Sequence, residues 1–117
     1  MNETQSYSRE HYPPAPVVDI YLAAPDSYNW QGPFPALLDS GADMTIVPMS
    51  FIAALRVPAI DEVALISQWR DRHVMRLFQV DLKIADQLLP AIDVVSDRWN
   101  KEILLGRNVL NRLDLRL

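Results

Sequence analysis

The chain has 117 residues, 50% of them apolar and 22% charged, with no cysteine, two histidines and a formal net charge of −4. Length and composition predict a single globular domain, and the absence of cysteine excludes disulfides, thiol nucleophiles and cysteine-ligated metals. The negative charge argues against a nucleic-acid partner, and two histidines without a phosphate loop or metal-ligand spacing predict no metal and no cofactor.

The first part of the chain predicts a lead-in followed by short strands. Residues 1–16 are polar and then rich in proline, which predicts a disordered or extended lead-in to one domain over residues 17–117. The β-branched run 17–22 predicts a strand. Residues 23–35 carry several proline, aspartate, asparagine and glycine residues and predict a loop. The N-terminus has no signal pattern, and no apolar run approaches about 18 residues, so we expect a cytoplasmic domain with no membrane contact.

The middle of the chain predicts more strands and one short helix. Short apolar strands are expected at residues 36–38 and 45–47, and a helix at residues 50–55 with Ser50 as its cap. Residues 63–66 and 74–84 give the clearest strand signals. The longer run alternates between apolar and polar residues, and the polar stretch between the two runs predicts a hairpin tip.

The last third of the chain completes an all-β pattern. Residues 88–95 predict a strand in which Pro90 indicates an edge or a bulge. A buried strand is expected at residues 103–105, helical turns at residues 107–113 and a terminal strand at residues 113–117. Seven or eight short strands with at most two short helices predict a mostly-β barrel or sandwich.

One pattern suggests catalytic chemistry. Residues 37–47 read Leu-Leu-Asp-Ser-Gly-Ala-Asp-Met-Thr-Ile-Val, so that Asp39 follows an apolar strand and Gly41 permits a tight turn. Two neighbouring carboxylates that share one proton can act as general base and general acid on a water molecule. The chain contains this pattern once, so chemistry that needs two carboxylates would take the second from another copy.

Two segments resemble the retropepsins, the retroviral-type aspartic proteases. Residues 36–47 are similar to the family's active-site segment, apolar-apolar-Asp-Thr/Ser-Gly-Ala. Residues 103–110, Ile-Leu-Leu-Gly-Arg-Asn-Val-Leu, are similar to its apolar-apolar-Gly-Arg-Asn/Asp segment and the helix that follows. A hairpin at residues 62–78 lies between them in the position of the family's flap.

The resemblance implies a fold and an activity. The expected fold is a small closed β-barrel of the retropepsin type, mostly β, with one short C-terminal helix. The expected protein is a homodimeric aspartic endopeptidase that hydrolyses peptide bonds in peptides or unfolded proteins, with no metal and no cofactor. In the family the terminal strands of both subunits interleave, which would involve residues 113–117.

The resemblance also assigns roles to the residues of the turn. Asp39 is expected to be the catalytic carboxylate, paired with Asp39 of a second subunit, with Ser40 in the hydroxyl network beneath the pair. Gly41 is expected to offer its carbonyl to substrate. Ala42 belongs to the same network and cannot donate a hydrogen bond to the pair, as serine could, so we expect a mildly acidic pH optimum above that of pepsin-like enzymes.

Further positions are expected to bind substrate or to support the turn. Asp43 is expected to accept N–H groups of substrate and to pair with Arg107, while Asn108 braces the turn. The residues expected to bind substrate are Gly41, Asp43, Met44, Ile46, Leu104 and Trp69, and those expected to support the site are Thr45, Gly106, Arg107 and Asn108.

The flap segment departs from the family and leaves alternatives open. Residues 66–73 contain no glycine, whereas the family's flap tip is usually rich in glycine. One alternative is a catalytically silent retropepsin-like module for dimerisation or peptide binding. The other is an unrelated small β-barrel in which Asp-Ser-Gly is an ordinary turn. Four further acidic residues lack calcium-loop spacing and are expected to be solvated strand ends: Asp81, Asp86, Asp93 and Asp97.

Overall fold

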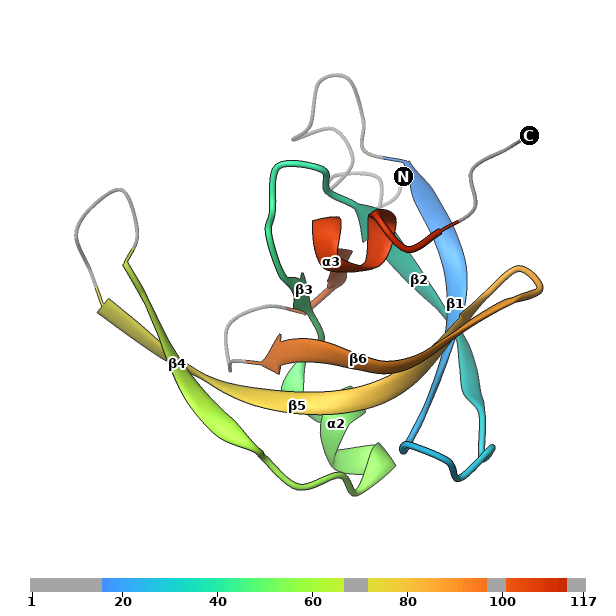
Figure 1. Cartoon of the computed structure of the whole chain (residues 1–117), viewed down its shortest axis with the longest axis horizontal. Coiled ribbons are helices and arrows are strands. Elements are labelled where there is room, and N and C mark those ends of the chain that lie inside the picture. The colour runs from blue at the N-terminus through green and yellow to red at the C-terminus, as the bar shows by residue number, and fades with distance from the viewer. Residues whose placement is uncertain (1–15, 67–71, 97–100, 114–117) are drawn as a thin grey trace, which may run out of the picture.

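A computed structural model describes residues 16–66, 72–96 and 101–113, and within them it places seven strands and two helices (Figure 1). The expected flap tip, Trp69 and the expected terminal strand therefore lie, wholly or largely, outside the described residues. The elements are β1 (Val17–Ala23), β2 (Gln31–Leu38), β3 (Thr45–Ile46), α2 (Met49–Leu55), β4 (Asp61–Ile66), β5 (Arg72–Ile84), β6 (Gln87–Ser96), β7 (Ile103–Leu105) and α3 (Arg107–Leu110).

Six of these strands close into a barrel. Their order is β1-β2-β7-β3-β6-β5, and β5 pairs back with β1, which closes the sheet. The pairs β2–β7 and β3–β6 are parallel, and the others are antiparallel. β4 pairs with the first half of β5, and this hairpin projects from the barrel (Figure 1). The predicted mostly-β closed barrel is thus confirmed, with α3 as its short C-terminal helix.

β5 belongs partly to the barrel and partly to the projecting hairpin. Along its second half Phe78, Val80, Leu82 and Ile84 point into the barrel and are buried. Val74 belongs to the same alternating series, but its side chain is 53% exposed because this part of β5 lies in the projecting hairpin. The sequence alternation therefore predicted the strand, but it did not show where the barrel ends.

β2 begins earlier than predicted, at Gln31, so that only residues 24–30 connect it to β1. Proline lacks the N–H that a central strand needs, yet Pro33 and Pro35 lie where β2 pairs only with β1, because β7 joins it from Ala36 onward. Gly32, which the sequence placed in a loop, has a φ of +133°, and an added Cβ would lie 2.7 Å from the carbonyl oxygen of Ile20. Glycine is therefore required here.

α2 closes one end of the barrel. Ile52 and Leu55 are buried, and the ring of Phe51 packs on that of Phe34 with centroids 4.6 Å apart. The predicted cap was wrong, because the helix starts one residue earlier than Ser50, with Pro48 preceding it and no side-chain cap. Neither helix in the described part of the chain is long and apolar enough to cross a membrane.

Candidate active site

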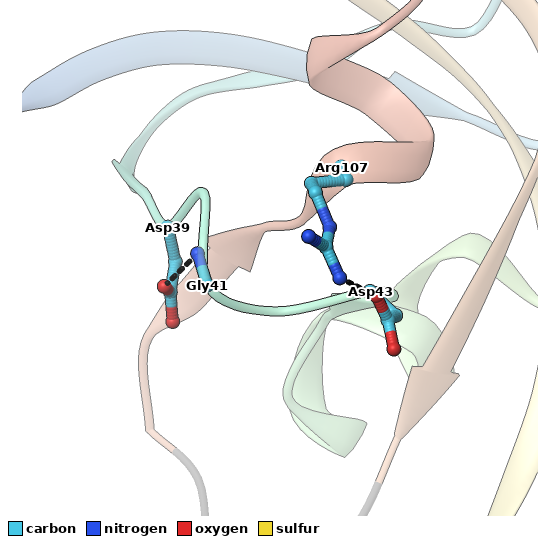
Figure 2. Close-up of polar contacts among 4 residues, drawn as sticks. All are labelled: Asp39, Gly41, Asp43 and Arg107. Carbon is cyan, nitrogen blue, oxygen red and sulfur yellow. Dashed lines mark hydrogen bonds and ion pairs between the residues drawn. The ribbon is translucent and has the colours of Figure 1, made fainter.

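Asp39 lies directly after β2, in the turn that the sequence singled out. Its backbone N–H donates to the carbonyl of Leu105, at 3.0 Å, which continues the parallel pairing of β2 with β7. Its Oδ1 accepts the N–H of Gly41, also at 3.0 Å (Figure 2). Its own carbonyl accepts the N–H of Ala42, at 3.2 Å. The half-buried carboxylate is thus oriented by the backbone of its own turn.

The segment after β7 packs against this turn from behind. An added Cβ on Gly106 would lie 2.4 Å from the carbonyl oxygen of Met44, so only glycine permits the approach. Backbone hydrogen bonds then join the two segments, from Arg107 to the carbonyl of Ala42 at 2.8 Å and from Asn108 to that of Asp43 at 3.2 Å. Residues far apart in sequence therefore form one rigid unit.

A buried hydrogen-bond chain locks this unit to the barrel. Thr45 is fully buried, and its Oγ1 accepts the backbone N–H of Gly106 at 3.0 Å and donates to Oδ1 of Asn108 at 2.8 Å. The side-chain amide of Asn108 in turn donates to the backbone carbonyl of Asp93 on β6, at 2.8 Å. The hydroxyl of Thr45 thus both accepts and donates a hydrogen bond, which satisfies a fully buried polar side chain and links three segments.

Arg107 forms an ion pair with Asp43 across the surface of the turn (Figure 2). The two side chains are 51% and 81% exposed. Ion pairs this open to solvent typically contribute less than about 1 kcal/mol. The pair therefore orients the carboxylate of Asp43 more than it stabilises the fold.

The structure brings some of the expected pocket residues together. Ile46 and Leu104 pair directly across β3 and β7, and Met44 precedes β3; all three are half-buried. Ser40 and Gly41 are exposed, and Ala42 is half-buried.

Gly41 was expected to permit a tight turn, but the observed turn has no steric need for glycine at this position. Gly32 is the only glycine with a positive φ, and a Cβ added at Gly41 would meet only Oδ1 of Asp39, at 3.4 Å. Within the described chain a Cβ at Gly41 would therefore make only this ordinary contact, and the turn itself does not demand glycine.

One contributor to the site was missed by the sequence. The backbone carbonyl of Asp93 anchors Asn108, whereas the exposed Asp93 side chain accepts a hydrogen bond from Gln79. A backbone role of this kind has no signature in residue type.

The described residues contain no cluster of three or more His, Cys, Asp or Glu side chains that could hold a metal ion.

Comparisons with known proteins identify the fold. No protein-family model and no curated protein sequence matches the chain. An EIAV protease solved with an inhibitor has a TM-score of 0.61 at 18% identity, covering 88% of this chain and 91% of that one. A retropepsin-like aspartic protease from Rickettsia conorii has a TM-score of 0.53 at 13% identity, covering 86% and 83%. A foamy viral protease-reverse transcriptase, complexed with double-stranded DNA, has a TM-score of 0.56 at 12% identity, covering 87% of this chain and 16% of that longer one. The chain thus has the retropepsin-like fold that its two motifs predicted.

Proposed function

We propose that this chain is an aspartic endopeptidase that acts as a homodimer, with one Asp39 carboxylate from each subunit. The observation that carries the proposal is the position of Asp39, in an Asp-Ser-Gly turn at the end of β2, held from behind by β7 in a retropepsin-like fold. Each chain supplies one such carboxylate, so a two-fold dimer is the simplest assembly that provides a pair.

The proposed chemistry uses the two carboxyl groups in opposite protonation states. The ionised Asp39 takes a proton from a bound water as the water oxygen attacks the peptide carbonyl carbon, and the protonated Asp39 gives its proton to the carbonyl oxygen. The tetrahedral intermediate then collapses: the carboxyl group that took the water proton gives it to the peptide nitrogen, the other carboxylate takes a proton from a hydroxyl of the intermediate, and the C–N bond breaks. No covalent enzyme intermediate forms.

The surroundings of Asp39 suit an extended peptide. Gly41 is exposed and has no side chain, so another backbone can approach its main chain closely, which gives this glycine a reason that the turn itself does not. The half-buried side chains of Met44, Ile46 and Leu104 would form apolar pockets beside it. We therefore expect apolar side chains on either side of the cleaved bond.

The central experiment replaces Asp39 by asparagine, which keeps the shape and removes the ionisable group. An unfolded protein is incubated with wild type, Asp39→Asn and the matched control Asp86→Asn, whose exposed carboxylate lies in the β5–β6 turn. Wild type and the control should cleave the substrate, and Asp39→Asn should lose at least about 1000-fold in kcat, in the range seen when a member of a catalytic unit is removed. Cleavage by Asp39→Asn at the wild-type rate would contradict the proposal.

Mixing the subunits tests the sharing of the site. In an equilibrated mixture of equal amounts of wild type and Asp39→Asn, random pairing should leave about one quarter of the dimers active. An activity of one half would instead mean that each chain acts alone.

The pH dependence of cleavage is a separate test. A pH–rate profile that peaks below about pH 3 would contradict the expected mildly acidic optimum.

A second candidate is a silent dimerisation or peptide-binding module, favoured by the glycine-free sequence of residues 66–73. Flap closure normally excludes water from such a site, and the sequence of residues 66–73 lacks the glycines that are usual at a flap tip. Dimers in sedimentation analysis that bind peptides but cleave none between about pH 3 and pH 8 would support this candidate over the enzyme.

A further inference from the structure

Asp81 contradicts the expectation of a solvated strand end. Its residue is only 6% exposed, although it lies on the outward-facing side of β5. Oδ1 accepts the backbone N–H of Ala91 and Oδ2 that of Asp26, both at 2.9 Å. Each oxygen of one buried carboxylate therefore holds a different segment, β6 on one side and the β1–β2 connection on the other.

Both amide donors belong to residues in left-handed backbone. The φ of Ala91 is +54° and that of Asp26 is +63°. Such conformations are unfavourable for residues with a Cβ and persist only where the surroundings hold them. A charge-assisted hydrogen bond to each N–H is a contact strong enough to do so.

The hydrogen bond to Ala91 lies at a β-bulge, and this bulge determines which residues of β6 face the core. Val80 pairs with Ile92 and Leu82 with Leu89, so Asp81 alone faces two β6 residues. Leu89 and Ile92 are both buried although they are three positions apart, an odd step that a regular strand could not provide. The bulge thus allows apolar side chains of β6 to point into the core both before the bulge, at Leu89, and after it, at Ile92.

The candidate active site depends on the part of β6 that follows the bulge. The carbonyl of Asp93, two residues after Ala91, accepts the side-chain amide of Asn108. Next to it, Val94 pairs with Thr45, the other residue of the buried hydrogen-bond chain. A shift by one residue would move the side chains of this part of β6 to the opposite face of the sheet and would turn the Asp93 carbonyl toward the strand on the other side.

We propose that Asp81 is a positioning residue of the site, which acts through the bulge: its carboxylate fixes Ala91, and the fixed bulge places the Asp93 carbonyl beneath Asn108. The role in catalysis rests on the proposed function, whereas the geometric role does not. Asparagine cannot replace this carboxylate, because its amide nitrogen would face one of the two N–H donors and could not accept from it.

The first measurement uses amide hydrogen exchange in the wild-type protein. Asp26 and Ala91 are exposed residues, yet their amides should exchange at least about tenfold more slowly than that of Asp86 in the neighbouring turn. Fast exchange at both amides in the wild type would overturn the proposal without the need for any variant.

The second measurement compares Asp81→Asn and Asp81→Ala with the matched control Asp86→Asn by NMR. In Asp81→Asn one of the Asp26 and Ala91 amides should lose its protection at least about tenfold. In Asp81→Ala, which keeps neither acceptor, the Ala91 amide should lose its protection and the side-chain amide signals of Asn108 should shift. The control should change neither. Asn108 signals that stay unchanged while the Ala91 amide loses protection would show a merely local role and overturn the proposal.

A rescue variant covers the case in which Asp81→Ala does not fold. Glycine adopts a positive φ without penalty, so Ala91→Gly should restore folding and part of the Asn108 signal to Asp81→Ala. A rescue equal to that of a glycine at Ala85, which also has a positive φ but lies outside the bulge, would count against the proposal. Peptide cleavage is assayed in parallel, and an inactive wild type with the expected NMR results would count against the proposed function alone.

Discussion

Replacing Gly106 by alanine measures how closely the segment after β7 packs against the Asp39 turn. The added Cβ would lie 2.4 Å from the carbonyl oxygen of Met44, 2.5 Å from its carbonyl carbon and 3.0 Å from the carbonyl oxygen of Ala42. All three are backbone atoms, so no side-chain rotation can relieve the contact. The two segments must separate by about 1 Å to approach an ordinary contact distance of about 3.5 Å.

The expected loss of stability follows from the hydrogen bonds that cross this contact. A separation of about 1 Å takes each of them beyond hydrogen-bonding range, and each contributes about 1 kcal/mol net. We therefore expect the free energy of unfolding to fall by about 3 kcal/mol, at the upper end of what overpacked sites show. The bonds are Arg107 N–H to the carbonyl of Ala42 (2.8 Å), Asn108 N–H to that of Asp43 (3.2 Å) and Gly106 N–H to Oγ1 of Thr45 (3.0 Å).

Urea unfolding followed by tryptophan fluorescence is a suitable assay. With a slope of about 1.5 kcal/mol per molar urea, a loss of about 3 kcal/mol lowers the midpoint by about 2 M. All variants are compared at one chain concentration, because dimerisation makes stability depend on concentration. Gly41→Ala is the matched control, since its Cβ would meet only Oδ1 of Asp39 at 3.4 Å. A midpoint for Gly106→Ala within about 0.5 M of the wild type would refute the reasoning.

Two further substitutions test contacts away from the catalytic carboxylate. Thr45→Val keeps the side-chain shape but leaves the N–H of Gly106 and Oδ1 of Asn108 without their buried partner, so thermal or urea unfolding should show a loss of about 2 kcal/mol; a loss under about 0.5 kcal/mol would contradict the role of the hydroxyl. Lys83→Met keeps the aliphatic stem but removes the ammonium group. This group lies 4.8 Å from the ring centroid of Trp30 and 5.2 Å from that of Tyr21. We expect a loss of about 0.5–1 kcal/mol by the same method, and unchanged stability would show that the cation does not matter.

Local sequence signals predicted the elements of the site well. The strand that ends at Leu38, the turn at Asp39 and the strand that ends at Leu105 were all placed from short apolar runs that stop at turn residues. Such signals depend on neighbours in the chain, so one sequence suffices to recognise them. The number and spacing of the strands predicted a mostly-β barrel or sandwich, and the resemblance of the two motifs to the retropepsins singled out the closed barrel.

The features that the sequence did not predict depend on partners far along the chain. Pro33 is compatible with β2 only because β7 pairs with a different part of that strand. Asp81 is buried between two segments, whose amide donors lie 55 and 10 residues away from it in the sequence. The steric need for glycine at Gly32 arises from the carbonyl of Ile20 on the neighbouring strand. No local pattern contains these contacts.

The parallel pairing of β2 with β7 also determines when the site can form during synthesis. Asp43 and Arg107, on the two halves of the unit, are separated by 64 residues, and contacts that close so long a loop form late, after local hairpins. A nascent chain therefore exposes the Asp39 turn without its backing segment until nearly all described residues have left the ribosome. The proposed hydrolytic centre cannot assemble before the segment after β7 has been synthesised and has packed against the Asp39 turn.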